Sequence, residues 1–216
     1  MEIWLIALIC IGALAVILFL LALLCYASAF FKRCDKNPLL KYFDAEDFGL
    51  TCESVELNRG KINLRGFVYR NQRVDDNGKV IIFAHGMGPG QAAYTTEIAY
   101  FCGLGYRILA LDSRGCGLSG GKSIRGMYEG VKTVEAAFGY LQNNGFGGDI
   151  YLLGHSWGAY SVLCASVSAD KIIAISAPAT PVKAIISGAA RIIGPLAYIL
   201  SPFWYLIGFF LFGKNG

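Results

Sequence analysis

The sequence is poor in histidine and in charge. Only two of its 216 residues are histidines, His85 and His155, and none follows position 155. The formal net charge of +4 is small, and the 19 Lys and Arg residues form no long basic run. Proteins that bind nucleic acid through charge carry a basic patch or stripe, so nucleic-acid binding is not predicted.

The cysteines lack the spacing of a metal site or of a disulfide framework. Their number, seven, is odd, and no two of them lie within four residues of each other. A zinc site of the CxxC type needs closely spaced pairs, and small secreted scaffolds pair their cysteines. The sequence therefore predicts no metal site, and a reducing compartment is the simplest interpretation.

Charge is absent from the stretch Ile3–Tyr26, and only Glu2 precedes it. A helix of this length reaches about 36 Å, which exceeds the roughly 30 Å hydrocarbon core of a bilayer. We therefore predict a transmembrane anchor over residues 1–30. A cleaved secretory signal is the alternative, although such signals have a basic start and a shorter apolar core.

Basic residues flank this stretch on one side only. No Lys or Arg precedes it, and four follow it: Lys32, Arg33, Lys36 and Lys41. The positive-inside rule then predicts a single-pass protein of the cell membrane, with its N-terminus outside and the downstream domain in the cytoplasm.

A polar segment over 31–49 is interpreted as a juxtamembrane linker. Leu50–Asn58 and Lys61–Arg70 have the composition of strands, and the turn that ends at Gly60 joins them. Two strands joined by a short glycine-containing turn predict an antiparallel hairpin.

Four short apolar runs follow the hairpin and alternate with helical stretches. The runs are Val80–Ala84, Tyr106–Leu111, Ile150–Leu153 and Ile172–Ile175, and the helices are expected at about 94–103, 128–143 and 157–169. Such runs are typical of parallel strands buried on both faces. The order predicts an α/β fold over 50–180, with a mostly parallel sheet, an N-terminal antiparallel hairpin and a preceding transmembrane helix.

The pentapeptide Gly154-His155-Ser156-Trp157-Gly158 matches the pattern G-x-S-x-G between a predicted strand and a predicted helix. On such a tight turn the serine hydroxyl stands clear of the sheet, and the glycines allow the two backbones to approach. Ser156 is therefore the candidate nucleophile. The alternative is that Ser156 only caps the following helix.

Three segments together resemble the α/β-hydrolase superfamily, and specifically its serine aminopeptidase (S33)/monoglyceride-lipase-like group. They are His85–Gly88, Asp112–Gly120 and Gly154–Gly158, and the resemblance covers roughly residues 46–180. The resemblance implies that this protein is a serine hydrolase. It would cleave an ester, thioester or amide through an acyl-enzyme, without a metal or organic cofactor.

The resemblance also implies roles for individual residues. Ser156 corresponds to the nucleophile, and the backbone N–H groups of Met87 and Trp157 correspond to the oxyanion hole. Six further residues match supporting positions: His85, Gly86, Gly154, Gly158, Asp112 and Arg114.

The expected base and acid are missing. In this superfamily the acid and then the histidine follow the nucleophile, but no His follows Ser156, and Asp170, the only later acid, lies at the wrong end of its strand. We therefore expect that the chain lacks the C-terminal third of the fold, that its sheet is incomplete, and that it is nearly inactive alone. His85 is a better substitute base than His155, because its strand lies beside that of the nucleophile, although the resemblance gives it a supporting role.

Residues 181–216 form a hydrophobic, lid-like segment. Its stretch Ile192–Phe212 has no charge, and Pro195 and Pro202 interrupt it. A lid or membrane-surface hairpin, a second membrane span and a buried core helix are the alternatives, and the first would suit a small or lipid-like acyl substrate. A non-catalytic membrane-tethered binding or scaffold module, and an integral membrane structural protein, are the rival functions.

Overall fold

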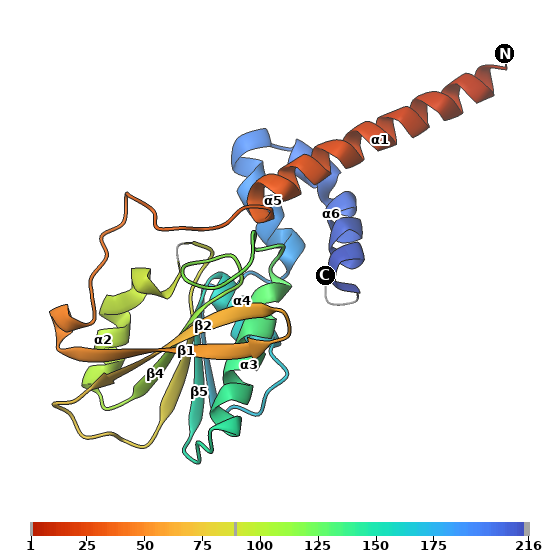
Figure 1. Cartoon of the computed structure of the whole chain (residues 1–216). Coiled ribbons are helices and arrows are strands. Elements are labelled where there is room, and N and C mark those ends of the chain that lie inside the picture. The colour runs from red at the N-terminus through yellow and green to blue at the C-terminus, as the bar shows by residue number, and fades with distance from the viewer. Residues whose placement is uncertain (1, 89, 214–216) are drawn as a thin grey trace. The chain divides into compact units, whose positions relative to one another are not determined.

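The computed structural model describes residues 2–88 and 90–213. It divides into two compact units. One comprises Lys32–Pro178 and contains the whole sheet, and the other combines the N-terminal helix with the two C-terminal helices (Figure 1).

The sheet has six strands in the order β1-β2-β4-β3-β5-β6. Their bounds are β1 Leu50–Arg59, β2 Ile62–Asn71, β3 Val80–Ala84, β4 Arg107–Asp112, β5 Ile150–His155 and β6 Lys171–Ile175. β1 and β2 form the expected antiparallel hairpin, β2 is antiparallel to β4, and the remaining pairs are parallel. The predicted α/β architecture, with a mostly parallel sheet and an N-terminal antiparallel hairpin, is confirmed.

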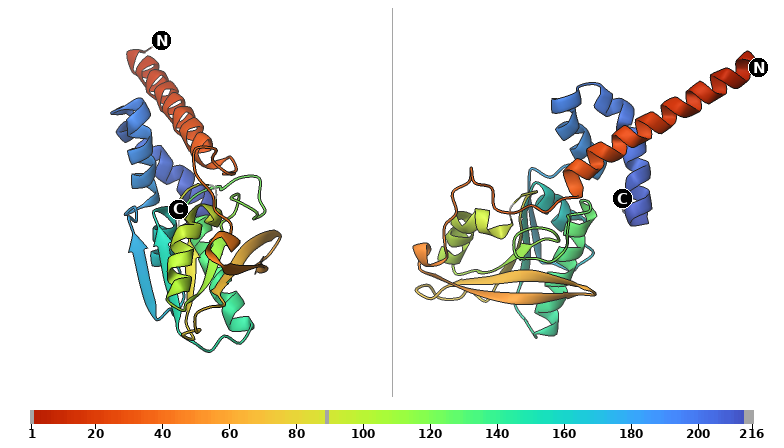
Figure 2. Two further views of the ribbon diagram at one scale, coloured as in Figure 1. Left: turned by 90° about the vertical axis from the view of Figure 1, so that its left-hand side faces the viewer. Right: turned by 45° about the horizontal axis from the view of Figure 1, so that its top comes forward.

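Helices cover both faces of the sheet (Figures 1 and 2). Because successive side chains of a strand point to opposite faces, Ile81 of β3 packs with α2 (Thr95–Gly103) and Ile82 packs with α3 (Tyr128–Asn143) and α4 (Trp157–Cys164). The buried apolar residues of α3 recur at spacings of three and four and form one stripe: Val131, Val134, Ala137, Phe138 and Leu141. Two 3-10 turns, Glu46–Phe48 and Gln91–Tyr94, complete the unit's helical elements among the described residues.

Helix α4 ends at Cys164, five residues before the predicted end at 169. Ala165 is extended, and the backbone N–H of Ser166 donates to the Glu135 carboxylate at 3.1 Å instead of continuing the helix. The serines at 166 and 168 are weak helix formers, so the apolar pattern overestimated the length.

The edge strand β6 is covered poorly. All five of its residues are exposed in the described structure, including the apolar Ile172, Ile173 and Ile175. An apolar strand edge without neighbours is a site for unwanted pairing with another chain. β6 therefore forms an open, apolar edge of the sheet.

Helix α1 spans Ile3–Phe30 and is the one helix of the described residues that is long and apolar enough to cross a membrane. The length and apolar composition of α1 suit a membrane span, and an N-terminal signal sequence has the same two properties.

The C-terminal segment forms two helices, α5 (Pro181–Ile193) and α6 (Leu196–Phe212). The break falls at Gly194 and Pro195, as expected, but Pro202 lies inside α6. The reason is local: Pro202 has no N–H for the carbonyl of Tyr198, and the hydroxyl of Ser201 donates to that oxygen at 2.8 Å instead.

Helix α6 packs on α1 through aromatic side chains. The indole N–H of the buried Trp204 donates to the carbonyl of Ala22 at 2.9 Å, and the rings of Phe19 and Phe203 meet edge to face with centroids 6.2 Å apart. A buried indole needs such a partner for its N–H. These contacts join α1 and α6 within their unit.

Candidate active site

The candidate site begins at the sharp turn between β5 and α4. Ser156 is the single residue between them. Its backbone has φ 53° and ψ −112°, a conformation that residues other than glycine rarely adopt. Its backbone N–H donates to the carbonyl of Ile175 at 2.8 Å, and its carbonyl accepts from Tyr160 at 3.0 Å. These two bonds fix the strained backbone in place.

The hydroxyl of Ser156 does not cap helix α4. Ser156 occupies the N-cap position, but its side chain makes no capping hydrogen bond, and the residue is only half-buried. The interpretation of Ser156 as a simple cap is therefore not supported. The hydroxyl remains available at the carboxyl edge of the sheet, beside the N-terminus of a helix.

The two glycines of the motif allow the close approach that the turn needs. A Cβ on Gly158 would lie 1.9 Å from the carbonyl oxygen of Ala84, and a Cβ on Gly154 would lie 2.3 Å from the backbone of Gly158. Real Cβ atoms do not come so close to backbone, so no other residue fits at either position without a shift of α4 against the sheet.

A second loop leaves the sheet next to this turn. Ala84 of β3 pairs with Gly154 of β5, so the segment from His85 to Met87 starts beside the segment that carries Ser156. Met87 is 42% exposed. The register thus brings the two predicted oxyanion loops to the same edge of the sheet.

Tyr94 joins the two loops, and the sequence analysis missed it. The N–H of Gly86 donates to the Tyr94 hydroxyl at 3.1 Å, and the same hydroxyl lies 2.9 Å from Nδ1 of His155. Burial raises the pKa of Tyr94, so its hydroxyl stays protonated at neutral pH. A tyrosine nine residues after His85 gives no sequence signal for this contact.

His85 is a structural residue. It is buried, its Nε2 accepts from the N–H of Ser113 at 3.1 Å, and its Nδ1 faces the carbonyl of Gly86 at 2.5 Å. The first contact requires an unprotonated Nε2, so Nδ1 carries the proton. Burial lowers the pKa of His85, which keeps the ring neutral. Both ring nitrogens are occupied by backbone partners, so the ring supports the loop that follows β3.

The hydrogen bonds of the two imidazoles go to partners other than Ser156. The ring of His155 is held by Tyr94, and among the described residues no hydrogen bond joins either imidazole to Ser156. The alternative in which His85 acts as a substitute base is therefore not supported by its contacts.

Asp112 organises the loop after β4. Its carboxylate accepts from the backbone N–H of Gln91 at 2.9 Å and of Leu118 at 2.7 Å, and burial raises its pKa. A Cβ on Gly117 would lie 2.1 Å from this carboxylate. Arg114 donates from Nε to the carbonyl of Ser123 at 3.1 Å in the same loop. These contacts are those of supporting residues.

The Trp157 side chain anchors the start of α4. It is buried, its indole N–H donates to the carbonyl of Met127 at 2.7 Å, and its ring meets His85 edge to face. The side chain therefore faces the core, while its backbone N–H belongs to the first turn of the helix, where no intrahelical acceptor exists.

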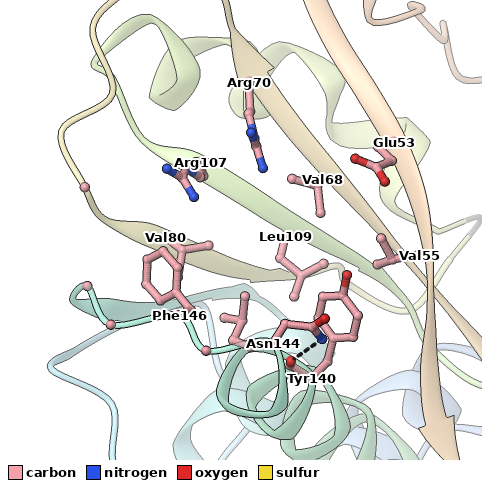
Figure 3. Close-up of a pocket in the computed structure, with 15 residues that line it drawn as sticks. Glu53, Val55, Val68, Arg70, Val80, Arg107, Leu109, Tyr140, Asn144 and Phe146 are labelled. Carbon is pink, nitrogen blue, oxygen red and sulfur yellow. Dashed lines mark hydrogen bonds between the residues drawn. The ribbon is translucent and has the colours of Figure 1, made fainter.

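A cavity of about 490 Å³ lies at the other end of the sheet (Figure 3). It is lined by the first residues of β3 and β4, Val80 and Arg107, together with Arg70 of β2 and the end of α3 near Phe146. Ligands of open α/β sheets bind at the carboxyl ends of the strands, so this cavity is separate from the candidate site. No group of three potential metal ligands occurs among the described residues.

Comparisons with known proteins agree with this geometry. A family model described as serine aminopeptidase, S33, matches residues 75–209, more than half of the chain. The match starts and ends later than the segment 46–180 that the motifs suggested. Epoxide hydrolase B of Mycobacterium tuberculosis is 29% identical over 85 residues, which are 39% of this chain and only 24% of that relative.

Solved structures show the same fold. An esterase of Pyrococcus furiosus matches with a TM-score of 0.63 and 22% identity, covering 86% of this chain and 71% of that one. An alpha/beta hydrolase of a Penicillium species matches with a TM-score of 0.53 and 20% identity, covering 65% and 53%. These matches show the α/β-hydrolase fold. Because the family model covers more than half of the chain, the chain belongs to the serine aminopeptidase S33 family.

Proposed function

We propose that this protein is a membrane-anchored serine hydrolase in which Ser156 attacks the carbonyl carbon of an ester, thioester or amide. The observation that carries the proposal is the backbone of Ser156, held at φ 53° between β5 and α4 with its hydroxyl uncommitted to the helix. Such strain costs about 1–3 kcal/mol and persists at sites where presenting the side chain has a use.

The oxyanion of the tetrahedral intermediate would be stabilised by backbone N–H groups of Met87 and Trp157. The pairing of Ala84 with Gly154 and the bridge through Tyr94 keep the two loops together. Loss of one such donor typically costs about 2.7–4 kcal/mol of transition-state stabilisation. These donors are backbone groups, so the side chains at 87 and 157 are not needed for this role.

Attack also requires a base that takes the serine proton. His85 has no ring nitrogen left for this task and His155 is turned to Tyr94. The 216-residue chain alone should therefore acylate very slowly, and the base and its acid partner would have to be supplied from elsewhere.

The nucleophile indicates the substrate class. A serine alkoxide beside backbone donors is suited to acyl transfer, which fits the esterase among the similar structures better than the epoxide hydrolase among the similar sequences. The apolar helices α1 and α6 favour an acyl substrate with a lipid-like chain.

The basic residues after α1 favour a cytoplasmic position for the sheet domain. Cys52 on β1 is exposed and reports on this directly. In intact cells a membrane-impermeant maleimide should label Cys52 only after permeabilisation, and equal labelling before it would contradict the proposed orientation.

A fluorophosphonate tests the nucleophile. We expect slow labelling of the detergent-solubilised chain, and we expect added imidazole to accelerate it by at least about tenfold, since a free base replaces the missing one. Ser156→Ala should abolish the imidazole-dependent adduct, whereas Ser168→Ala, at an exposed serine beyond α4, should not change it.

The second candidate function is a non-catalytic membrane-tethered binding module. The observation that favours it is the double engagement of His85, which leaves Ser156 without a contacting base among the described residues. Labelling of Ser156 no faster than that of Ser168, even with imidazole, would support the module and contradict the hydrolase.

A further inference from the structure

The segment that follows α1 is fixed against the loop after β4. Cys34 forms a parallel bridge with Cys116: its N–H donates to the carbonyl of Gly115 at 2.8 Å, and its carbonyl accepts from Gly117 at 3.3 Å. The carbonyl of Lys32 accepts from Ile124 at 3.2 Å. Backbone hydrogen bonds on both sides thus place the two cysteines opposite each other.

Arg33 strengthens this attachment. Its guanidinium donates to the carbonyl oxygens of Ser119 at 3.0 Å, Gly121 at 2.6 Å and Gly117 at 2.8 Å. The planar guanidinium can satisfy several acceptors at once, so it holds the loop in one conformation. The backbone hydrogen bonds and the guanidinium of Arg33 therefore hold Cys34 and Cys116 next to each other.

The two thiols are unequal. Cys34 is partly exposed and Cys116 is completely buried. A hydrogen bond from the Cys116 thiol, helped by the charge of Lys32, lowers the pKa of Cys34 to about 7. The same hydrogen bond, together with burial, raises the pKa of Cys116. At neutral pH the accessible sulfur therefore carries much of its thiolate form, and the buried sulfur stays protonated beside it.

We propose that Cys34 and Cys116 form a redox-active thiol pair that a hydroperoxide converts into a disulfide. Adjacent strands lie about 4.8 Å apart, and disulfides accept Cα separations of about 4.4–6.8 Å, so the bridge geometry suits the bond. This site is separate from Ser156 and does not depend on the proposed hydrolase activity.

The reaction takes two steps. The Cys34 thiolate attacks the terminal oxygen of the hydroperoxide, the O–O bond breaks, and the alcohol, or water from hydrogen peroxide, leaves after it takes up a proton. The sulfur of Cys116 then attacks the resulting sulfenic acid, the S–O bond breaks, and water leaves with the thiol proton. Two thiols and one hydroperoxide thus give one disulfide, one alcohol and one water.

Oxidation would close the loop 113–121 onto the segment that follows α1. The N–H of Leu118 in this loop binds the carboxylate of Asp112, which lies beside the buried His85. The disulfide would therefore restrain the loop that supports the candidate active site.

The test uses the purified, reduced full chain and about one equivalent of hydrogen peroxide. We expect a mass loss of two hydrogens, a cross-linked peptide pair containing Cys34 and Cys116, and full reversal by dithiothreitol. Cys34→Ser should abolish the cross-link, and Cys52→Ser, at the exposed cysteine of β1, should leave it unchanged. Because Cys34 is only partly buried, its variant is expected to fold.

Two further measurements keep the proposal open to contradiction. Alkylation of Cys34 by iodoacetamide should rise with pH around a midpoint near 7. Arg33→Gln should slow formation of the cross-link several-fold, because three hydrogen bonds to the loop are weakened. Oxidation of Cys52 or Cys164 while Cys116 stays reduced, or conversion of Cys34 to a sulfinic acid without a cross-link, would overturn the proposal.

Discussion

Strands β3 and β6 have similar sequences and opposite surroundings. β3 reads VIIFA and all five residues are buried, whereas β6 reads KIIAI and all five are exposed. β3 lies between β4 and β5 and has helices packed on both faces, while β6 pairs with β5 alone. An apolar run thus predicts a strand, but the neighbouring elements determine whether that strand belongs to the core.

The same contrast separates the loops that follow the strands. His85, after β3, is buried and bonded through both ring nitrogens, and Ser176, after β6, is exposed. The candidate site lies at the ends of the two central strands β3 and β5, where the surrounding packing can hold a strained backbone. The edge strand contributes one of these restraints, since the carbonyl of Ile175 at the end of β6 accepts from the backbone N–H of Ser156 at 2.8 Å.

The largest expected effect is on stability. Ile82→Ala in β3 should lower the free energy of unfolding by about 2–5 kcal/mol, because it removes buried methyl groups and leaves a cavity. Ile173→Ala in β6, where the side chain is exposed, should change it by about 0.5 kcal/mol or less. Urea unfolding measures the free energy of unfolding of both variants. Equal decreases would contradict the difference between the two strands.

A smaller loss is expected where α4 touches β3. Gly158→Ala should destabilise the fold by about 1–3 kcal/mol, because its Cβ would meet the carbonyl oxygen of Ala84 at 1.9 Å. Gly188→Ala is the matched helical control, since no atom lies within 4 Å of its Cβ, and it should be neutral or stabilising. Thermal unfolding followed by circular dichroism gives the comparison, and a neutral Gly158→Ala would contradict the close packing.

A gain of about 1 kcal/mol is expected from relieving backbone strain. Ser156 and Ser176 have φ values of 53° and 56°, so glycine at either position should raise the free energy of unfolding. Ser156→Gly should also abolish fluorophosphonate labelling, whereas Ser176→Gly should not. Destabilisation by both glycines would show that the turns are not strained.

The smallest effect is a pH dependence from His85. Burial lowers its pKa in the folded state, while an unfolded imidazole takes up a proton near pH 6.5. The stability that neutral His85 contributes is therefore complete above about pH 6.5 and is lost as the pH falls further. Burial raises the pKa of Asp112, so protonation of this carboxyl at lower pH favours the folded state and opposes the effect of His85. His85→Gln should flatten the decrease between pH 7.5 and 5.5, and an unchanged slope would contradict the neutral ring.

Much of the sheet domain could be predicted from local signals. Short apolar runs marked β3, β5 and β6, and spacing in α3 marked its buried face, because these patterns depend on strand and helix geometry alone. The turn at Ser156 was predicted because glycines on either side are needed wherever a strand and a helix meet so closely.

Contacts between distant segments could not be predicted in the same way. Tyr94 contacts His155, which lies 61 residues later in the sequence, and thereby joins two loops. No local sequence pattern around Tyr94 indicates this contact. The packing of Trp204 against Ala22 joins residues 182 positions apart. Pro202 was expected to interrupt its helix, and the hydroxyl of Ser201 that compensates for it is evident only from the structure.

The most direct measurement is a crystal structure of the phosphonate adduct formed in the presence of imidazole. The account predicts continuous density from the Ser156 Oγ to phosphorus, with the phosphonyl oxygen about 2.7–3.1 Å from the backbone nitrogens of Met87 and Trp157. An adduct on another residue, or a phosphonyl oxygen that points away from both nitrogens, would contradict it.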